Sequence, residues 1–208
     1  RNQDPGLEWQ ARLHEASCQA LRGRIGDARK ALVATADLDR ERVPANDLAR
    51  LQSRDALAHA LVRKLDGDLE GALDACARAL RSVLKDATSV DRVRALWFKS
   101  AILLELGEAN EALEAAFDAR EYAKAARVNP RWQMFVSDLG IADILLSCGR
   151  PNEALERLDD ALREGGAFLK SQPALRGEGR RLRAESAWRA LDESQRDPKR
   201  TQALVDAL

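Results

Sequence analysis

His14 and Cys18 have the sequence spacing expected of a general base and a nucleophile on one helix. Residues four apart share one face of a helix, so an imidazole there could take the proton of the thiol. When the internal repeats described below are aligned, however, Cys18 shares its position with His59, Lys99 and Ile141. Such a mixed position is typical of the flank of a structural helix. We therefore expect His14 and Cys18 to have a structural role.

The sequence lacks the usual motifs for metal ligation and phosphate binding. It has two histidines and three cysteines, with no Cys-x-x-Cys, His-Glu-x-x-His or phosphate-loop pattern. Gly177 and Gly179 do not follow a predicted strand, as dinucleotide-binding glycines would. Asp159 and Asp160 are expected to form a solvated pair on a helix surface. The sequence therefore predicts a protein that is not an enzyme and uses neither a metal nor a cofactor.

A basic patch is predicted near the C-terminal end. Arg176, Arg180 and Arg183 recur at helical spacing, which places them on one side of a helix. Such a side could meet an acidic protein or a nucleic acid. Glu178 and Glu185 lie close enough to offset the charge, and no aromatic side chains are interleaved for base stacking. We favour an ordinary solvated surface over an acidic partner, and an acidic partner over nucleic acid.

Aromatic side chains are few, and all four tryptophans fall on predicted first helices of the repeats. Trp97 and Phe98 are adjacent, so they point about 100° apart around a helix and one should be more exposed than a core residue. Trp132 lies close to Met134 and Phe135 in the fourth repeat, so there too one large apolar side chain should be more exposed than a core residue. Aromatic contacts with a ligand are therefore expected in the third and fourth repeats.

The elements that position these residues are predicted to be helices. The chain of 208 residues is 45% hydrophobic and 33% charged, which is typical of a folded protein. Its formal net charge is zero, so general affinity for nucleic acid or acidic membranes is not expected. Abundant Ala, Leu and Arg, with few aromatic residues, favour an all-α fold.

The compartment is predicted from the cysteines and from hydropathy. No apolar run reaches the roughly 18 residues of a membrane span. Three widely spaced cysteines do not form a disulfide framework and favour the cytoplasm, with the periplasm as an open alternative. Because the sequence begins at Arg1, we expect it to be a piece of a longer protein.

An internal repeat organises the chain. Four glycines lie 41, 40 and 42 residues apart, each followed five residues later by Ala and six later by Leu, and a weaker fifth copy falls near 197–204. The pattern indicates a helix, a tight turn and a second helix, since glycine readily ends a helix and Ala permits close packing. An apolar residue stands five positions before each glycine. The glycines are Gly26, Gly67, Gly107 and Gly149, and the apolar residues are Leu21, Val62, Ile102 and Ile144.

The connectors contain Pro44, Pro130 and Pro173, at which a helix must stop or start. These signals divide the chain into first helices and partner helices. The first helices are expected near 7–24, 46–65, 90–106, 131–147 and 174–192, and their partners near 27–38, 69–84, 109–127, 151–164 and 198–208.

Two segments, 100–113 and 142–155, resemble the tetratricopeptide repeat (TPR) in their small residue, turn glycine and Ala-Leu pair. The period near 41 is closer to the long-helix variant of bacterial regulators, such as the maltose-regulon transcription activator. Arg22 and Arg63 depart from the family, which usually has a bulky apolar residue there. The resemblance implies an all-α, right-handed α-α superhelix of about five repeats in one domain, 1–208. The repeats are expected at 7–43, 46–87, 90–128, 131–168 and 174–208.

The resemblance also implies that first helices line a concave groove for a protein or peptide. The family's carboxylate clamp is not expected, because its Lys and Asn positions hold Leu57, Leu61, Trp97 and Ala101 here. We predict a non-enzymatic binding scaffold within a larger bacterial protein. The alternative is a small-molecule-sensing domain of a bacterial transcription activator, kinase or diguanylate cyclase. The groove candidates are Arg54, Arg94, Trp97, Glu105, Trp132, Val136, Leu139 and Asp143.

Overall fold

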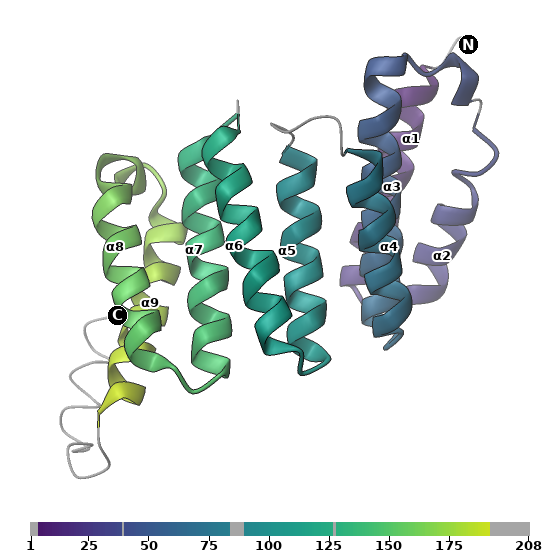
Figure 1. Ribbon diagram of the computed structural model, residues 1–208. Coiled ribbons are helices and arrows are strands. Elements are labelled where there is room, and N and C mark those ends of the chain that lie inside the picture. Colours follow the sequence, from purple (N-terminus) through teal and green to yellow (C-terminus); the bar gives the residue numbers. More distant parts are fainter. Residues whose placement is uncertain (1–3, 39, 84–89, 127, 192–208) are drawn as a thin grey trace. The chain divides into compact units, whose positions relative to one another are not determined.

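The computed structural model describes residues 4–38, 40–83, 90–126 and 128–191. Over these residues its regular structure is α-helical apart from one short 3-10 turn, which confirms the all-α prediction (Figure 1). The elements are α1 (Pro5–Leu21), α2 (Ile25–Val33), η1 (Arg40–Arg42), α3 (Ala45–Leu65), α4 (Leu69–Ser82), α5 (Val90–Glu105), α6 (Ala109–Ala125), α7 (Pro130–Ser147), α8 (Pro151–Lys170) and α9 (Pro173–Ala190).

The chain forms two compact units, Arg1–Ala115 and Ala116–Leu208, and the division falls within α6. In the first unit α1 packs against α2 and α3, and α3 packs against α4 and α5. In the second unit α8 packs against α7 and α9, and α7 also contacts α9. Consecutive helices within each unit lie side by side and run in opposite directions (Figure 1).

Three of the predicted turn glycines end a helix in the left-handed conformation: Gly67 (φ 85°), Gly107 (φ 84°) and Gly149 (φ 69°). At each turn the glycine N–H donates to the carbonyl three residues back at 3.1 Å. The next N–H donates to the carbonyl five residues back at 2.9 Å. These paired bonds satisfy carbonyls that the helix end would otherwise leave without a partner.

The prediction for the first turn is wrong. The left-handed residue is Gly23 (φ 76°), and Gly26 lies inside α2. Gly23 and the residue after it make the same two hydrogen bonds as the later turns. The predicted alignment follows the Ala-Leu pair at 31–32, whereas the structurally equivalent alanine is Ala28. Leu21, which the alignment placed in an apolar column, is instead 71% exposed.

With this register corrected, the repeats share one packing arrangement. In each of the four copies whose turn the structure describes, the alanine five residues after the turn glycine is fully buried, and the residue seven before that glycine is small and buried. Small side chains here allow two helix backbones to approach closely. The two sets are Ala28, Ala72, Ala112 and Ala154, and Ala16, Ala60, Ser100 and Ala142.

Two partner helices depart from their predicted ends by five or more residues, whereas α4 and α6 end two residues early. α2 ends at Val33, five residues early, and the hydroxyl of Thr35 donates to the carbonyl of Leu32 at 2.7 Å, which supplies a local alternative to the helical bond. α8 extends to Lys170 but is kinked at Gly166, whose φ of 28° and ψ of −112° are not helical, so its regular part ends close to the predicted end at 164 and a short second segment follows. The predicted helix at 198–208 lies outside the described residues.

Candidate ligand groove

A groove of about 270 Å³ opens in the first unit between α1, α3 and α5. These are the first helices of three successive repeats. The turn glycines that follow these helices are Gly23, Gly67 and Gly107. The lining side chains stand at equivalent sequence positions, thirteen, ten, nine or six residues before the glycine. The lining residues are Gln10, Leu13, His14 and Ser17 of α1, Arg54, Leu57, Ala58 and Leu61 of α3, and Arg94 and Phe98 of α5.

The groove combines apolar side chains with two arginines that share one carboxylate. Nε of Arg54 donates to Oδ1 of Asp91 at 3.0 Å, and a terminal nitrogen of Arg94 lies 3.7 Å from the same oxygen. The Asp91 side chain is 3% exposed, whereas those of Arg54 and Arg94 are 31% and 49% exposed. The carboxylate is therefore shielded, while both arginine side chains are partly exposed and line the groove.

The other first-unit candidates lie outside the lining. Trp97 is half-buried, and its neighbour Phe98 lines the groove in its place. Glu105 is exposed at the end of α5 and forms an ion pair with Lys64 of α3. Sequence reasoning assigned His14 to a structural role, but its exposed side chain also lines the groove.

The second-unit candidates lie on α7. Trp132 and Val136 are half-buried, and Leu139 is buried, close to Gly179 of α9. Asp143 is exposed. Although the residue as a whole is exposed, neighbouring atoms keep some water from its carboxyl group, which raises its pKa, while the positive charge of Arg181 on α9 acts in the opposite direction.

The basic patch on α9 is partly neutralised. Arg183 forms an ion pair with Asp159 of α8. Arg176 is half-buried and Arg180 is exposed. The acidic residues expected to offset the patch are engaged elsewhere, because Glu178 and Glu185 both pair with Arg181.

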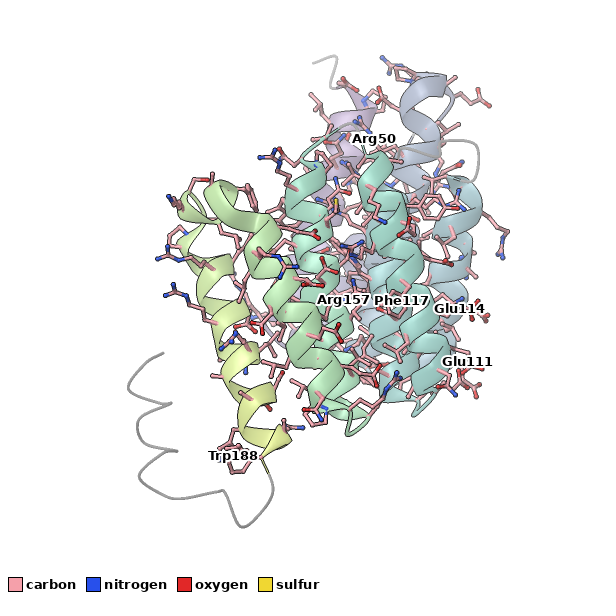
Figure 2. The ribbon with its side chains drawn as sticks, turned by 60° about the vertical axis from the view of Figure 1, so that its left-hand side comes forward. Arg50, Glu111, Glu114, Phe117, Arg157 and Trp188 are labelled. Carbon is pink, nitrogen blue, oxygen red and sulfur yellow. The ribbon has the colours of Figure 1, made fainter. Side chains whose placement is uncertain are left out.

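A buried charged cluster in the second unit was not found by sequence reasoning. Asp138 of α7 is 2% exposed, and its Oδ1 accepts hydrogen bonds from Nε of Arg120 at 2.6 Å and from Arg157 at 3.3 Å. Arg157 also lies over the ring of Phe117, 5.2 Å from its centroid (Figure 2). Burial raises the pKa of Asp138, and the two arginines oppose this shift. The sequence feature that could have indicated this cluster is the position of Asp138 within the mostly apolar segment 135–146.

The cysteines and acidic residues do not assemble into a metal site within the described part of the chain, where no group of three or more His, Cys, Asp or Glu could hold an ion. Cys18 is exposed, Cys148 is half-buried and Cys76 is fully buried. Burial raises the pKa of the Cys76 thiol to about 12. None of the described helices combines the length and apolarity needed to cross a membrane.

Comparison with known proteins identifies the fold. No family model and no curated protein matches the chain. Among solved structures, it is similar to a kinesin light chain-like protein of Podosopora anserina with nearly identical TPR-like repeats. A variant of that protein is 16% identical with a TM-score of 0.70, covering 100% of this chain and 95% of the other. The unsubstituted form is 16% identical with a TM-score of 0.69 and coverage of 99% and 94%.

A third solved structure is also similar to this chain over nearly its whole length. BtubC of P. vanneervenii is 16% identical with a TM-score of 0.62, and the match covers 97% of this chain and 87% of BtubC. At this identity the likeness concerns the fold and leaves the function open. The glycine-ended helix pairs and the whole-chain matches together give this chain the fold of the TPR-like helical-repeat proteins.

Proposed function

We propose that this chain is a non-enzymatic scaffold that binds a protein through an extended peptide segment in the α1–α3–α5 groove. TPR-like repeat scaffolds are generally protein-interaction modules. The observation that carries the proposal is that equivalent positions of three successive first helices line one groove. Parallel presentation of the same positions suits a peptide that crosses the helices, with one side chain contacting each repeat.

The composition of the groove supports this type of ligand. Leu13, Leu57 and Phe98 supply apolar contact area. Gln10 and Ser17 supply hydrogen-bonding groups for a peptide backbone. A largely apolar surface with a few placed polar groups is the usual composition of a binding site.

We further propose that the scaffold is the interaction region of a larger, cytoplasmic bacterial protein, folded as one five-repeat domain over 1–208. A small-molecule-sensing domain of a signalling protein is the second candidate. The observation behind that alternative is the groove volume of about 270 Å³, which lies just below the usual range of small-ligand pockets, roughly 300–1,000 Å³, and suits only a small ligand.

Selection from a phage-displayed library of random dodecapeptides tests the first proposal. Enriched peptides, labelled with fluorescein, are titrated by fluorescence anisotropy against the unmodified chain and against Phe98→Ala. We expect about a tenfold loss of affinity for Phe98→Ala, since a groove aromatic supplies much of the contact area. The matched control is Phe117→Ala, which removes an exposed ring from α6 and should leave affinity unchanged.

Failure to enrich any peptide, or equal losses in both phenylalanine variants, would contradict peptide binding in this groove. The alternative is tested by a thermal-shift screen of small organic acids. A rise in Tm on addition of one of these acids, absent in Phe98→Ala, would favour the small-molecule-sensing domain.

A further inference from the structure

We infer that the α1–α3–α5 groove selects a peptide in which one carboxylate side chain is flanked by apolar side chains. This inference rests on the proposed peptide-binding function and names the chemistry of the peptide. It depends on three observations: the charge of the groove, the orientation of Arg54, and the positions of the apolar residues.

The first observation is an excess of positive charge. The charged side chains that line the groove are Arg54 and Arg94, and no acidic side chain is among the lining residues that the structure describes. The carboxylate that contacts both arginines is Asp91, which is buried beneath them. Two guanidinium groups therefore share one carboxylate, and a second carboxylate from a ligand would complete the pairing.

The second observation concerns how Asp91 holds Arg54. The hydrogen bond at 3.0 Å uses Nε of Arg54. A carboxylate bound at Nε restrains the guanidinium and leaves its terminal nitrogens as donors for another acceptor. Asp91 thus acts as a positioning residue that prepares Arg54 for a ligand before it arrives, which lowers the entropic cost of binding.

The third observation is the position of the apolar residues. Leu57 and Leu61 lie one and two helical turns after Arg54 on α3, and Phe98 lies one turn after Arg94 on α5. A ligand carboxylate at the arginines therefore has apolar surface beside it. A basic ligand residue in the same place would face two guanidinium groups, which is repulsive and discriminates against it.

The experiment uses three pools of fluorescein-labelled dodecapeptides. The central triplet is Leu-Glu-Leu, Leu-Gln-Leu or Leu-Lys-Leu, and the flanking positions are degenerate. Each pool is titrated into the full chain by fluorescence anisotropy at about 0.1 M salt. We expect the Glu pool to bind about tenfold more tightly than the Gln pool and the Lys pool to bind most weakly.

A charge reversal identifies the groups responsible. Arg94→Glu should lower affinity for the Glu pool and raise it for the Lys pool. Arg94→Gln should remove the preference without reversing it. The matched control is Arg50→Glu, which makes the same charge change on α3 at an arginine outside the groove lining. Circular dichroism verifies that each variant retains its helical content.

The outcomes separate the inference from the function on which it rests. Equal binding of the three pools, or a preference that Arg94→Glu leaves unchanged, overturns the inference while peptide binding stands. Preference for the Lys pool also overturns it. Absence of binding by every pool contradicts both the inference and the proposed peptide-binding function.

Discussion

At the scale of single residues, Asp138 decides how three helices of the second unit are held together. Its side chain is 3% exposed and lies within 3.3 Å of nitrogens from Arg120 on α6 and Arg157 on α8. A buried carboxylate costs free energy unless it is paired, and removing it takes from both arginines the buried partner that they share. The cluster therefore links its three helices through charge.

Asp138→Ala is expected to lower the free energy of unfolding by about 3 kcal/mol, because it removes the close, buried partner of Arg120 and leaves that guanidinium only the exposed carboxylate of Glu164, 3.7 Å away. Urea denaturation followed by circular dichroism measures the change. Asp143→Ala on the same helix is the matched control and should change stability by less than about 0.5 kcal/mol, since Asp143 is exposed. Equal effects of the two substitutions would contradict the role of the cluster.

His59 should make stability depend on pH. Burial lowers its pKa from 6.5, and the negative charge of Asp55 opposes the shift. The unfolded chain therefore binds a proton more readily than the folded chain, so this contribution is complete above pH 6.5 and is lost as pH falls through the lowered pKa. We expect His59→Gln to reduce the fall in Tm between pH 7 and pH 5.

The control for this prediction is His14→Gln, because the His14 side chain is exposed on α1. The His14→Gln variant should show the same fall in Tm between pH 7 and pH 5 as the unmodified chain. A fall in Tm that is unchanged in His59→Gln would assign the effect to other groups.

Thiol reactivity should distinguish the buried and exposed cysteines. With its pKa raised to about 12, the Cys76 thiol is almost entirely protonated at pH 8 and is also inaccessible. Ellman's reagent should react rapidly with exposed Cys18 in the native chain, and with Cys76 only after denaturation. Cys18→Ser should remove the fast phase, and Cys76→Ser should leave it intact. The reverse result would show that the buried site opens readily.

At the scale of elements, close approach between helices decides which glycines matter. On α9, a Cβ at Gly179 would lie 2.9 Å from Cζ of Phe135 and 3.1 Å from Cδ2 of Leu162. A Cβ at Gly177 would meet nothing within 4 Å. The two glycines have the same helical context and differ only in what faces them. Gly179 therefore permits α9 to pack against α7 and α8.

Gly179→Ala is expected to destabilise the chain by about 1–2 kcal/mol, because the added methyl group overpacks a tight contact. Gly177→Ala is expected to stabilise it by up to about 1 kcal/mol, because Ala favours the helix and nothing obstructs it. Urea denaturation measures both changes. Substitutions with the same sign would contradict close packing at Gly179.

The helix boundaries show how far local sequence signals reach. The turns at Gly67, Gly107 and Gly149 were predictable because glycine readily adopts the left-handed conformation that ends each helix. The first repeat was misaligned by three residues because two nearby glycines, Gly23 and Gly26, both offered that option. Packing selects Gly23, since this register places Ala28 in a fully buried position.

At the scale of the whole molecule, the candidate site depends on residues about forty positions apart. Arg54 and Arg94 were predictable as groove candidates because they occupy equivalent positions in successive repeats. Their shared contact with Asp91 was not predictable, because α3 and α5 must pack before residues 37 positions apart can form a bond. The same applies to the bonds of Asp138 with Arg120 and Arg157, which join separate helices.

The sequence alone determined the helical repeat, its period and most of its turns, because helix propensity, glycine conformation and the size of buried side chains act over a few neighbouring residues. Tertiary structure alone decided the register of the first repeat and the partners of the buried carboxylates. It also decided which aromatic residue of the third repeat faces the groove. Those outcomes depend on how helices distant in sequence fill space and pair charges, and no local pattern encodes that arrangement.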